Sequence, residues 1–173
     1  FNNPGSVKTQ KRLLKAMDKG GLPKVPLLIN IGKSKDTALE DAPEDYATTV
    51  ARLNGFADAF VINVSSPNTP GLRKLQSGDE LKKIIEACQA TNERKVPLLV
   101  KVSPDLDDQD LATVVKVAQE AGCAGIVATN TTTSRPDESI IMSQEGGLSG
   151  KPLTDLSTQI IRKIADLTDG GWP

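Results

Sequence analysis

The chain has 173 residues, of which 38% are hydrophobic and 25% are charged, and its formal net charge is -1, which is typical of one soluble globular domain. Its acidic and basic side chains are interleaved, which argues against binding to nucleic acid. Because it contains no histidine, the sequence cannot supply a Ser-His-Asp triad, a histidine-ligated metal site or a histidine general base.

Short apolar runs alternate with amphipathic stretches along the chain. The first predicted elements are a helix over about Val7 to Asp18, a strand over Leu27 to Ile31, a helix with Pro43 near its first turn and a strand over Phe60 to Val64. They are followed by a helical stripe from Leu81 to Cys88, a strand over Leu98 to Val102, a helical stripe from Leu111 to Ala118, a strand over Gly125 to Thr129 and a helical stripe from Ile160 to Leu167. This alternation, with roughly thirty residues per unit, indicates right-handed βαβ crossovers and a parallel sheet.

Two α/β architectures contain such units, a doubly wound open sheet and a (β/α)₈ barrel. Polar residues follow every predicted strand, at 30–35, 63–69, 101–105 and 130–135. The barrel is preferred, because a barrel collects functional groups from many strand ends whereas an open sheet concentrates them at one switch point. A barrel has eight units in about 250 residues. We therefore expect residues 1–173 to form a single partial domain, the middle of a barrel with about four of its units.

The densest polar motif runs from Asn63 to Leu72, directly after a predicted strand. The amides of Asn63 and Asn68 can both donate and accept hydrogen bonds, and two prolines stiffen the loop that presents them. This composition suits a planar polar ligand. The alternative is an ordinary turn that joins a strand to a helix.

Lys101 is predicted to project inward near the end of the next strand, where a buried ammonium is costly unless it is paired or used. It can serve as a cation beside an electron-rich cofactor or as a Schiff-base amine. The alternative is a lysine whose ammonium reaches solvent at the rim of the barrel.

Three further segments give weaker signals. Thr129-Asn130-Thr131-Thr132 ends another predicted strand, and Asn130 is either a site residue or an ordinary cap. The segment Gly146 to Gly150 either brings backbone N–H groups close to a phosphate or flavin, or forms a surface loop. Asn30-Ile31-Gly32-Lys33 fits a turn as well as it fits a site.

Considered together, these motifs resemble those of dihydroorotate dehydrogenases. The resemblance rests on segments in matching order and spacing: Phe1-Asn2-Asn3, Asn30 to Lys33, Asn63 to Leu72, Val100 to Val102, Thr129 to Thr132 and Gly146 to Leu153. Ser66 stands where the cytosolic class has cysteine, so the chain resembles the central part of the quinone-linked, membrane-associated class.

The resemblance implies FMN as cofactor and oxidation of dihydroorotate to orotate in pyrimidine biosynthesis, with electrons passing on to ubiquinone. It implies that Ser66 is the base that removes the C5 proton of the substrate. The residues implied to hold the substrate are Phe1, Asn63, Asn68, Asn130 and Thr131. Those implied to contact FMN are Asn30, Asn63, Lys101, Thr129, Ser149 and Gly150. No metal is implied.

The same resemblance implies a mitochondrial inner membrane as the location, with a bacterial inner membrane as the alternative. No apolar run in the sequence approaches the ~20 residues that span a bilayer, so we expect the quinone-binding and membrane segments to lie outside it. We expect the 173-residue chain alone to be inactive. Two other functions stay open, a barrel lyase that forms a Schiff base through Lys101 and a non-catalytic ligand-binding barrel fragment.

Overall fold

Four short strands lie side by side and form one parallel sheet in the order β1-β2-β3-β4. The computed structural model describes residues 3–22, 24–67, 71–135 and 146–173. The strands are β1 (Leu28–Ile31), β2 (Ala59–Asn63), β3 (Leu98–Lys101) and β4 (Gly125–Val127). The helices are α1 (Gly5–Asp18), α2 (Ala42–Leu53), α3 (Gly78–Thr91), α4 (Asp108–Glu120) and α5 (Thr154–Leu167), with short 3₁₀ helices η1 (Leu72–Gln76) and η2 (Lys151–Leu153).

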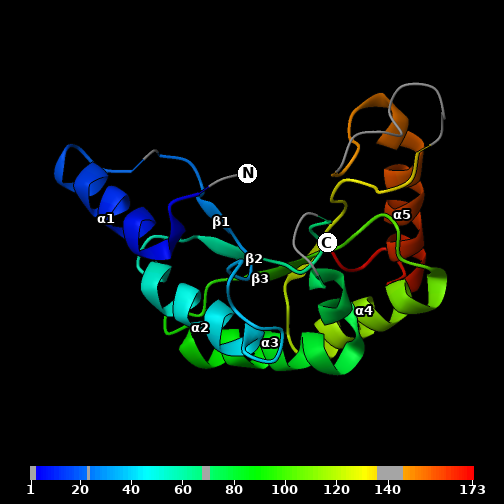
Figure 1. Ribbon diagram of the computed structural model, residues 1–173, viewed down its shortest axis with the longest axis horizontal. Helices are drawn as coiled ribbons and strands as arrows, with labels where there is room; N and C mark the ends of the chain where they lie inside the picture. The colour runs from blue at the N-terminus through cyan, green and yellow to red at the C-terminus, as the bar shows by residue number, and fades with distance from the viewer. Residues whose placement is uncertain (1–2, 23, 68–70, 136–145) are drawn as a thin grey trace.

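The helices cover one side of the sheet, and the other side is open (Figure 1). Helices α2, α3 and α4 pack along the closed side, while α1 and α5 rise at the two ends of the curved sheet. A parallel sheet that curves inside a layer of crossover helices is the wall of a (β/α)₈ barrel. The predicted fold class, a barrel of which about four units are present, is therefore confirmed.

The predicted elements are correct in type and order, but several of their ends differ. The first helix begins at Gly5 rather than Val7, and β2 begins at Ala59. The first strand prediction ends correctly at Ile31, whereas the other three run one or two residues too far at their carboxyl ends. Val64 and Val102, which lie just beyond the ladders, are nevertheless fully buried. The apolar run in the sequence reports this burial, which continues after strand pairing has stopped.

The core lies between the sheet and the helices. Phe60, Ile62 and Val100 point from the strands into it and are completely buried, as are Ile84 and Ile85 on α3. On α5 the predicted stripe is only half buried, since Ile160 and Ile164 are covered whereas Ile161 and Leu167 remain 50% and 47% exposed. Packing against the sheet, rather than helix propensity, thus fixes which faces are covered.

The alternate residues of the strands face the open side of the sheet, because successive side chains of a strand point to opposite faces. They include Leu28 and Asn30 of β1, Asn63 of β2 and Lys101 of β3. At the edge of the sheet, the carbonyl of Pro173 accepts a hydrogen bond of 2.9 Å from the N–H of Ile126, so Pro173 lies beside β4 where a fifth strand would run. Within the described ranges, no helix is both long enough and apolar enough to cross a membrane.

Candidate functional site

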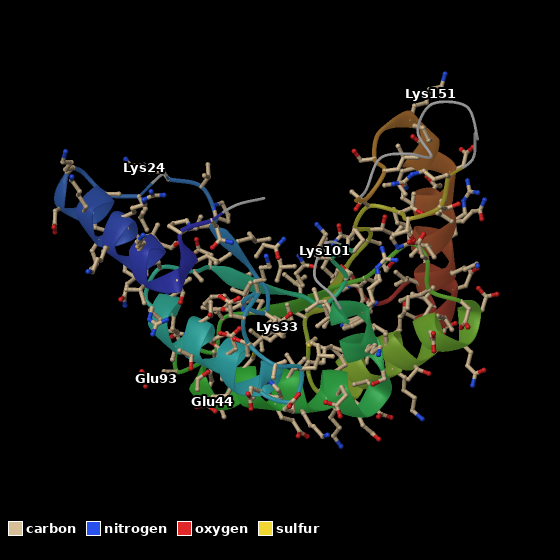
Figure 2. All side chains as sticks on the ribbon, viewed as in Figure 1. Lys24, Lys33, Glu44, Glu93, Lys101 and Lys151 are labelled. Carbon is tan, nitrogen blue, oxygen red and sulfur yellow. The ribbon has the colours of Figure 1, made fainter. Side chains whose placement is uncertain are left out.

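The carboxyl ends of the strands bring the predicted polar residues to one region of the open face. Asn63 and Lys101 are register partners in β2 and β3, so their side chains lie next to each other on the same side of the sheet. Asn30 pairs with Val61, two residues before Asn63, and Thr129 comes two residues after Val127, the partner of Lys101. Figure 2 shows Lys101 on the open side, whereas Glu44 and Glu93 lie among the helices.

Two polar groups at this end of the sheet have no hydrogen-bonding partner among the described residues. Lys101 is half-buried, and its ammonium forms no hydrogen bond or ion pair with any described residue. The hydroxyl oxygen of Thr129 is buried and is likewise without a hydrogen bond in the described part of the chain. Buried polar atoms are nearly always satisfied, so a hydroxyl and a cation at the ends of adjacent strands, both without a partner among the described residues, fit a polar, electron-rich ligand such as a flavin.

A network of hydrogen bonds ties the ends of β2 and β4 together. The amide nitrogen of Asn130 donates to the hydroxyl of Ser65 at 3.0 Å and to the amide oxygen of Asn63 at 3.2 Å. Ser65 in turn donates to the same oxygen of Asn63 at 3.0 Å. Asn130 accepts a bond of 2.8 Å from the N–H of Thr131. Two amides expected to bind one substrate are thus brought together, and buried Ser65, which the sequence analysis did not single out, joins them.

Asn63 is also held from behind by a tyrosine on α2. The phenol of Tyr46 donates to the carbonyl of Asn63 at 2.8 Å, and the tyrosine is completely buried. Burial raises the pKa of Tyr46 far above its ordinary value, so the phenol stays neutral and remains a donor. In the sequence Tyr46 is one large residue on the inner face of an amphipathic helix, which gives no sign of this contact.

The glycine-rich segment lies against the residues that follow β4. Thr132 and Leu148 form an antiparallel bridge with backbone hydrogen bonds of 3.1 and 2.7 Å. A Cβ atom on Gly147 would clash with the hydroxyl oxygen of Thr131, so only glycine allows this approach. Ser149 and Gly150, which follow, are exposed, and their predicted contact with a cofactor stays a prediction.

Of the remaining predicted residues, the structure describes Ser66 but not Phe1 or Asn68. Ser66 is half-buried and follows Ser65 in the loop after β2. Phe1 and Asn68, both predicted to bind substrate, lie outside the described residues. No group of three or more metal-binding side chains occurs in the part of the chain that the structure describes.

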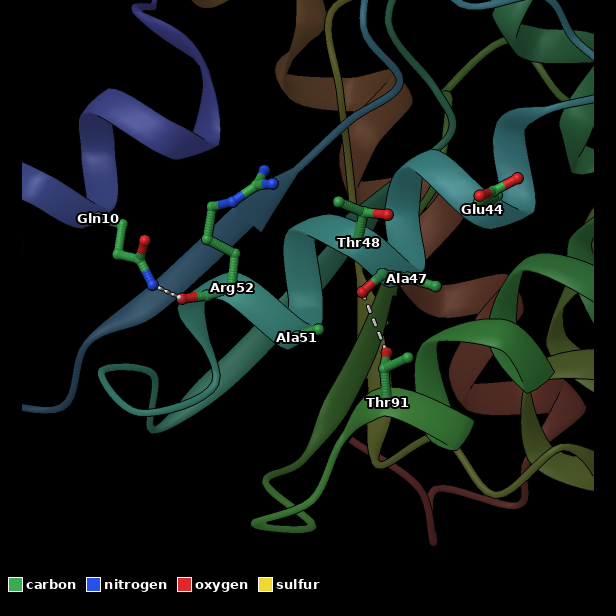
Figure 3. A pocket seen from close by; sticks show the side chains of 7 residues that line it. All are labelled: Gln10, Glu44, Ala47, Thr48, Ala51, Arg52 and Thr91. Carbon is green, nitrogen blue, oxygen red and sulfur yellow. Dashed lines mark hydrogen bonds between the residues drawn. The ribbon is translucent and has the colours of Figure 1, made fainter.

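A separate groove lies elsewhere, on the helical layer. This groove of about 530 Å³ is lined by residues of three helices: Gln10, Glu44, Ala47, Thr48, Ala51, Arg52 and Thr91. Two of its polar side chains bond within the protein, since Gln10 donates to the carbonyl of Arg52 at 2.8 Å and Thr91 donates to that of Ala47 at 3.1 Å (Figure 3). The groove shares no residue with the strand-end cluster, which is therefore the better candidate site.

Comparisons with known proteins agree with the motifs. The sequence profile described as dihydroorotate dehydrogenase matches residues 1–173. Dihydroorotate dehydrogenase (quinone) of Halobacterium salinarum is 49% identical over 172 residues, which cover 98% of this chain and 47% of the relative. The protein of the same name from Synechococcus sp. is 43% identical over 190 residues and is matched over 49% of its length by 100% of this chain. The chain thus spans about half the length of the curated relatives it matches.

Solved structures give the same result. The crystal structure of DHODH from Eimeria tenella in complex with ferulenol superposes with a TM-score of 0.89 at 36% identity, covering 98% of this chain and 52% of that one. The ligand-free form gives 0.88 at 37% identity, covering 98% and 53%. The curated relatives above, with that of Deinococcus radiodurans, come from archaea and bacteria, so they do not support the expected mitochondrial location.

Proposed function

Since this chain belongs to the dihydroorotate dehydrogenase family, we propose that the complete protein oxidises dihydroorotate to orotate in pyrimidine biosynthesis and passes the electrons to a quinone. One observation carries this proposal. Asn63, Asn130 and Lys101 converge at the carboxyl ends of adjacent strands, where a barrel enzyme has its active site. Residues 1–173 then form the middle of a single FMN-binding barrel domain, a role that their four parallel strands and the position of Pro173 support.

We propose that the flavin is FMN and that Lys101 and Thr129 are its principal contacts. FMN would supply the hydride acceptor and the electron route to the quinone. The Lys101 ammonium, which has no partner among the described residues, would stabilise negative charge on this group. The buried Thr129 hydroxyl would gain the hydrogen bond that it lacks. Asn30 and Asn63 reach the same face from neighbouring strands, and Ser149 and Gly150 would close the site from the glycine-rich segment.

The substrate is proposed to bind against the amides of Asn63 and Asn130. Because Ser65 holds both amides, their donors and acceptors are fixed before the substrate arrives, which lowers the cost of orienting its ring. Thr131 adjoins Asn130 and would extend this contact. Phe1 and Asn68 are proposed as further substrate contacts.

Ser66 is proposed to be the base that takes the proton from C5 of dihydroorotate. Loss of this proton from C5 and of a hydride from C6 converts the C5–C6 single bond of dihydroorotate to the double bond of orotate. A serine hydroxyl is a weak base at neutral pH, so it needs a neighbouring group or water to accept its own proton. The loop position of Ser66, next to the Asn63–Ser65–Asn130 network, supports the assignment.

The location is proposed to be a bacterial inner membrane. Quinones are confined to lipid, so an enzyme that reduces one has to reach a membrane surface. The bacterial and archaeal curated relatives favour this location over the mitochondrial one.

The test uses the full-length protein that contains this chain. The purified protein should be yellow, and its flavin absorbance should bleach anaerobically on addition of dihydroorotate. In Ser66→Ala the bleaching rate should fall about 10²- to 10⁴-fold while the flavin remains bound. Ser77→Ala is the matched control, because the Ser77 hydroxyl makes no capping bond to α3. Absence of flavin, together with borohydride trapping of a carbonyl compound on Lys101, would overturn the proposal in favour of a Schiff-base lyase.

A further inference from the structure

An arginine near the proposed active site links three loops. Arg73 lies on η1, which follows the loop that carries Ser66. Its Nη1 donates to Asp105, in the loop after β3, at 2.8 Å. Its Nη2 donates to the carbonyl of Thr131, after β4, at 3.3 Å, and its Nε donates to the carbonyl of Ser65, after β2, at 3.4 Å. One guanidinium thus touches the loops that follow three consecutive strands.

Asp105 completes this link from the other side. Its Oδ2 accepts from the backbone N–H of Thr133 at 2.9 Å and from the Thr133 hydroxyl at 3.0 Å, while its Oδ1 accepts from the Thr132 hydroxyl. The side chains of Arg73 and Asp105 are only 26% and 19% exposed. Partial burial raises the pKa of Asp105, but hydrogen bonds from Thr132, Thr133 and Arg73 lower it by more, so the carboxylate stays charged at neutral pH.

The pair is not needed to anchor η1 to the core. Leu72 and Leu75 hold this helix by burial, since each is only 2% exposed. The side chain of Gln76 adds a buried hydrogen bond of 3.2 Å from the N–H of Ser103. The hydrogen bonds of Arg73 go instead to the loops at the carboxyl ends of the strands. Besides Asp105, the guanidinium bonds two backbone carbonyls there. The carbonyl of Ser65 belongs to the peptide bond that joins Ser65 to Ser66, and the carbonyl of Thr131 belongs to a residue next to Asn130.

We propose that Arg73 and Asp105 are positioning residues for the reaction, setting the distance between the Ser66 loop and the loop of Asn130 and Thr131. This inference rests on the proposed function, in which Ser66 takes a proton from a substrate that Asn130 and Thr131 hold. A shift of about 1 Å between base and substrate costs roughly 100-fold in rate. The side-chain hydrogen bonds of the Asn63–Ser65–Asn130 network are made without Arg73, which contacts Ser65 only at its backbone carbonyl, so the amides that bind the substrate should stay in place.

Arginine is required here because of its shape. Its planar fork directs separate N–H groups to Asp105, Thr131 and Ser65 at once, whereas a lysine ammonium keeps the charge but cannot reproduce this geometry. In full-length Arg73→Lys and Asp105→Asn we therefore expect kcat to fall about 10- to 100-fold, with KM for dihydroorotate changing less than about threefold. Because the two residues act as a unit, the double variant should lose little more than the worse single variant.

The matched control is Arg94→Lys. Arg94 also bonds backbone carbonyls, those of Asn54 at 2.9 Å and Ala57 at 3.0 Å, but it does so at the amino end of the strands. We expect Arg94→Lys to change the thermal midpoint but not kcat. Amide hydrogen exchange of residues 131–135 provides a readout independent of turnover, and it should accelerate in Arg73→Lys and Asp105→Asn but not in Arg94→Lys.

The outcomes separate the two proposals. If the wild-type full-length protein holds no flavin that dihydroorotate bleaches, the proposed function fails. If the wild type is active but Arg73→Lys and Asp105→Asn match Arg94→Lys in kcat and in exchange of 131–135, the positioning role fails. Should Arg73→Lys not fold, the nearly isosteric Asp105→Asn decides: unchanged kcat in that variant overturns the inference.

Discussion

Cys88, on α3, and Cys123, between α4 and β4, are buried thiols. Burial raises the pKa of each to about 12, and for Cys88 the proximity of Cys123 adds to the effect. The reactive form of cysteine is the thiolate, so both thiols should be inert in the folded protein. At about pH 8 we expect neither to react with a thiol reagent until the protein unfolds, as judged by mass spectrometry of labelled peptides. Labelling of Cys88 at the rate of a free thiol under native conditions would contradict this burial.

Asp105 should make stability depend on pH in a defined direction. Its pKa in the folded protein lies below the ordinary carboxyl value, so its contribution is fully present above the unfolded pKa and is lost as pH falls through the folded pKa. We expect the wild type to be more stable than Asp105→Asn at about pH 6, and the difference to shrink as pH is lowered below about 4. Chemical unfolding of both proteins across this pH range measures the difference in their free energies of unfolding. A difference that grew on acidification would show that Asp105 is not stabilised as a carboxylate.

At the level of single elements, α4 has a side-chain cap that can be tested separately. Asp107 precedes the helix, and its carboxylate accepts a hydrogen bond of 2.8 Å from the N–H of Asp110. Replacing such a cap with alanine removes a partner from the first turn and costs about 1 kcal/mol. We expect Asp107→Ala to lower the free energy of unfolding of the full-length protein by this amount. Asp107→Ser, which retains a capping oxygen, should recover most of the loss, and an equal loss in both variants would mean that the cap contributes nothing.

The sequence was sufficient to predict elements whose pattern is local. The stripes that begin at Leu81 and Leu111 repeat at helical spacing, and both became helices with those residues buried. The meeting of Asn63 with Lys101 was also predictable, because parallel strands with polar carboxyl ends place them together.

What could not be predicted depends on the path of the loops. Tyr46 contacts Asn63 across 17 positions, and Arg73 contacts Thr131 across 58 positions. Both residues have ordinary sequence neighbours. Tyr46 lies on one face of a predicted helix, and Arg73 lies in a short segment after a polar loop. Side chains become partners at such separations only when tertiary packing has set the loop conformations, so spacing alone carries no signal of them.

At the scale of the whole molecule, the sheet has one covered face and one open face. On the open face Leu28 is 53% exposed, and Val25 just before it is 66% exposed. Helix α1 has no buried residue, and Val7, Leu14 and Met17 are each about half exposed on it. Apolar surface of this extent on a soluble protein usually marks a contact with other protein. In a complete barrel, further strands and helices would cover it.

The 173 residues expressed alone should therefore associate with one another and show no turnover. Exposure of the Leu14 and Met17 side chains to water is unfavourable, and contact between copies removes part of this cost. We expect sedimentation velocity to show species larger than a monomer at micromolar concentration, and an apolar dye to bind the preparation. The double variant Leu14→Gln, Met17→Gln should reduce both signals, whereas Lys15→Gln, a change at an exposed polar position of the same helix, should alter neither. A monomeric preparation that unfolds cooperatively and bleaches with dihydroorotate would show that the open face needs no further cover.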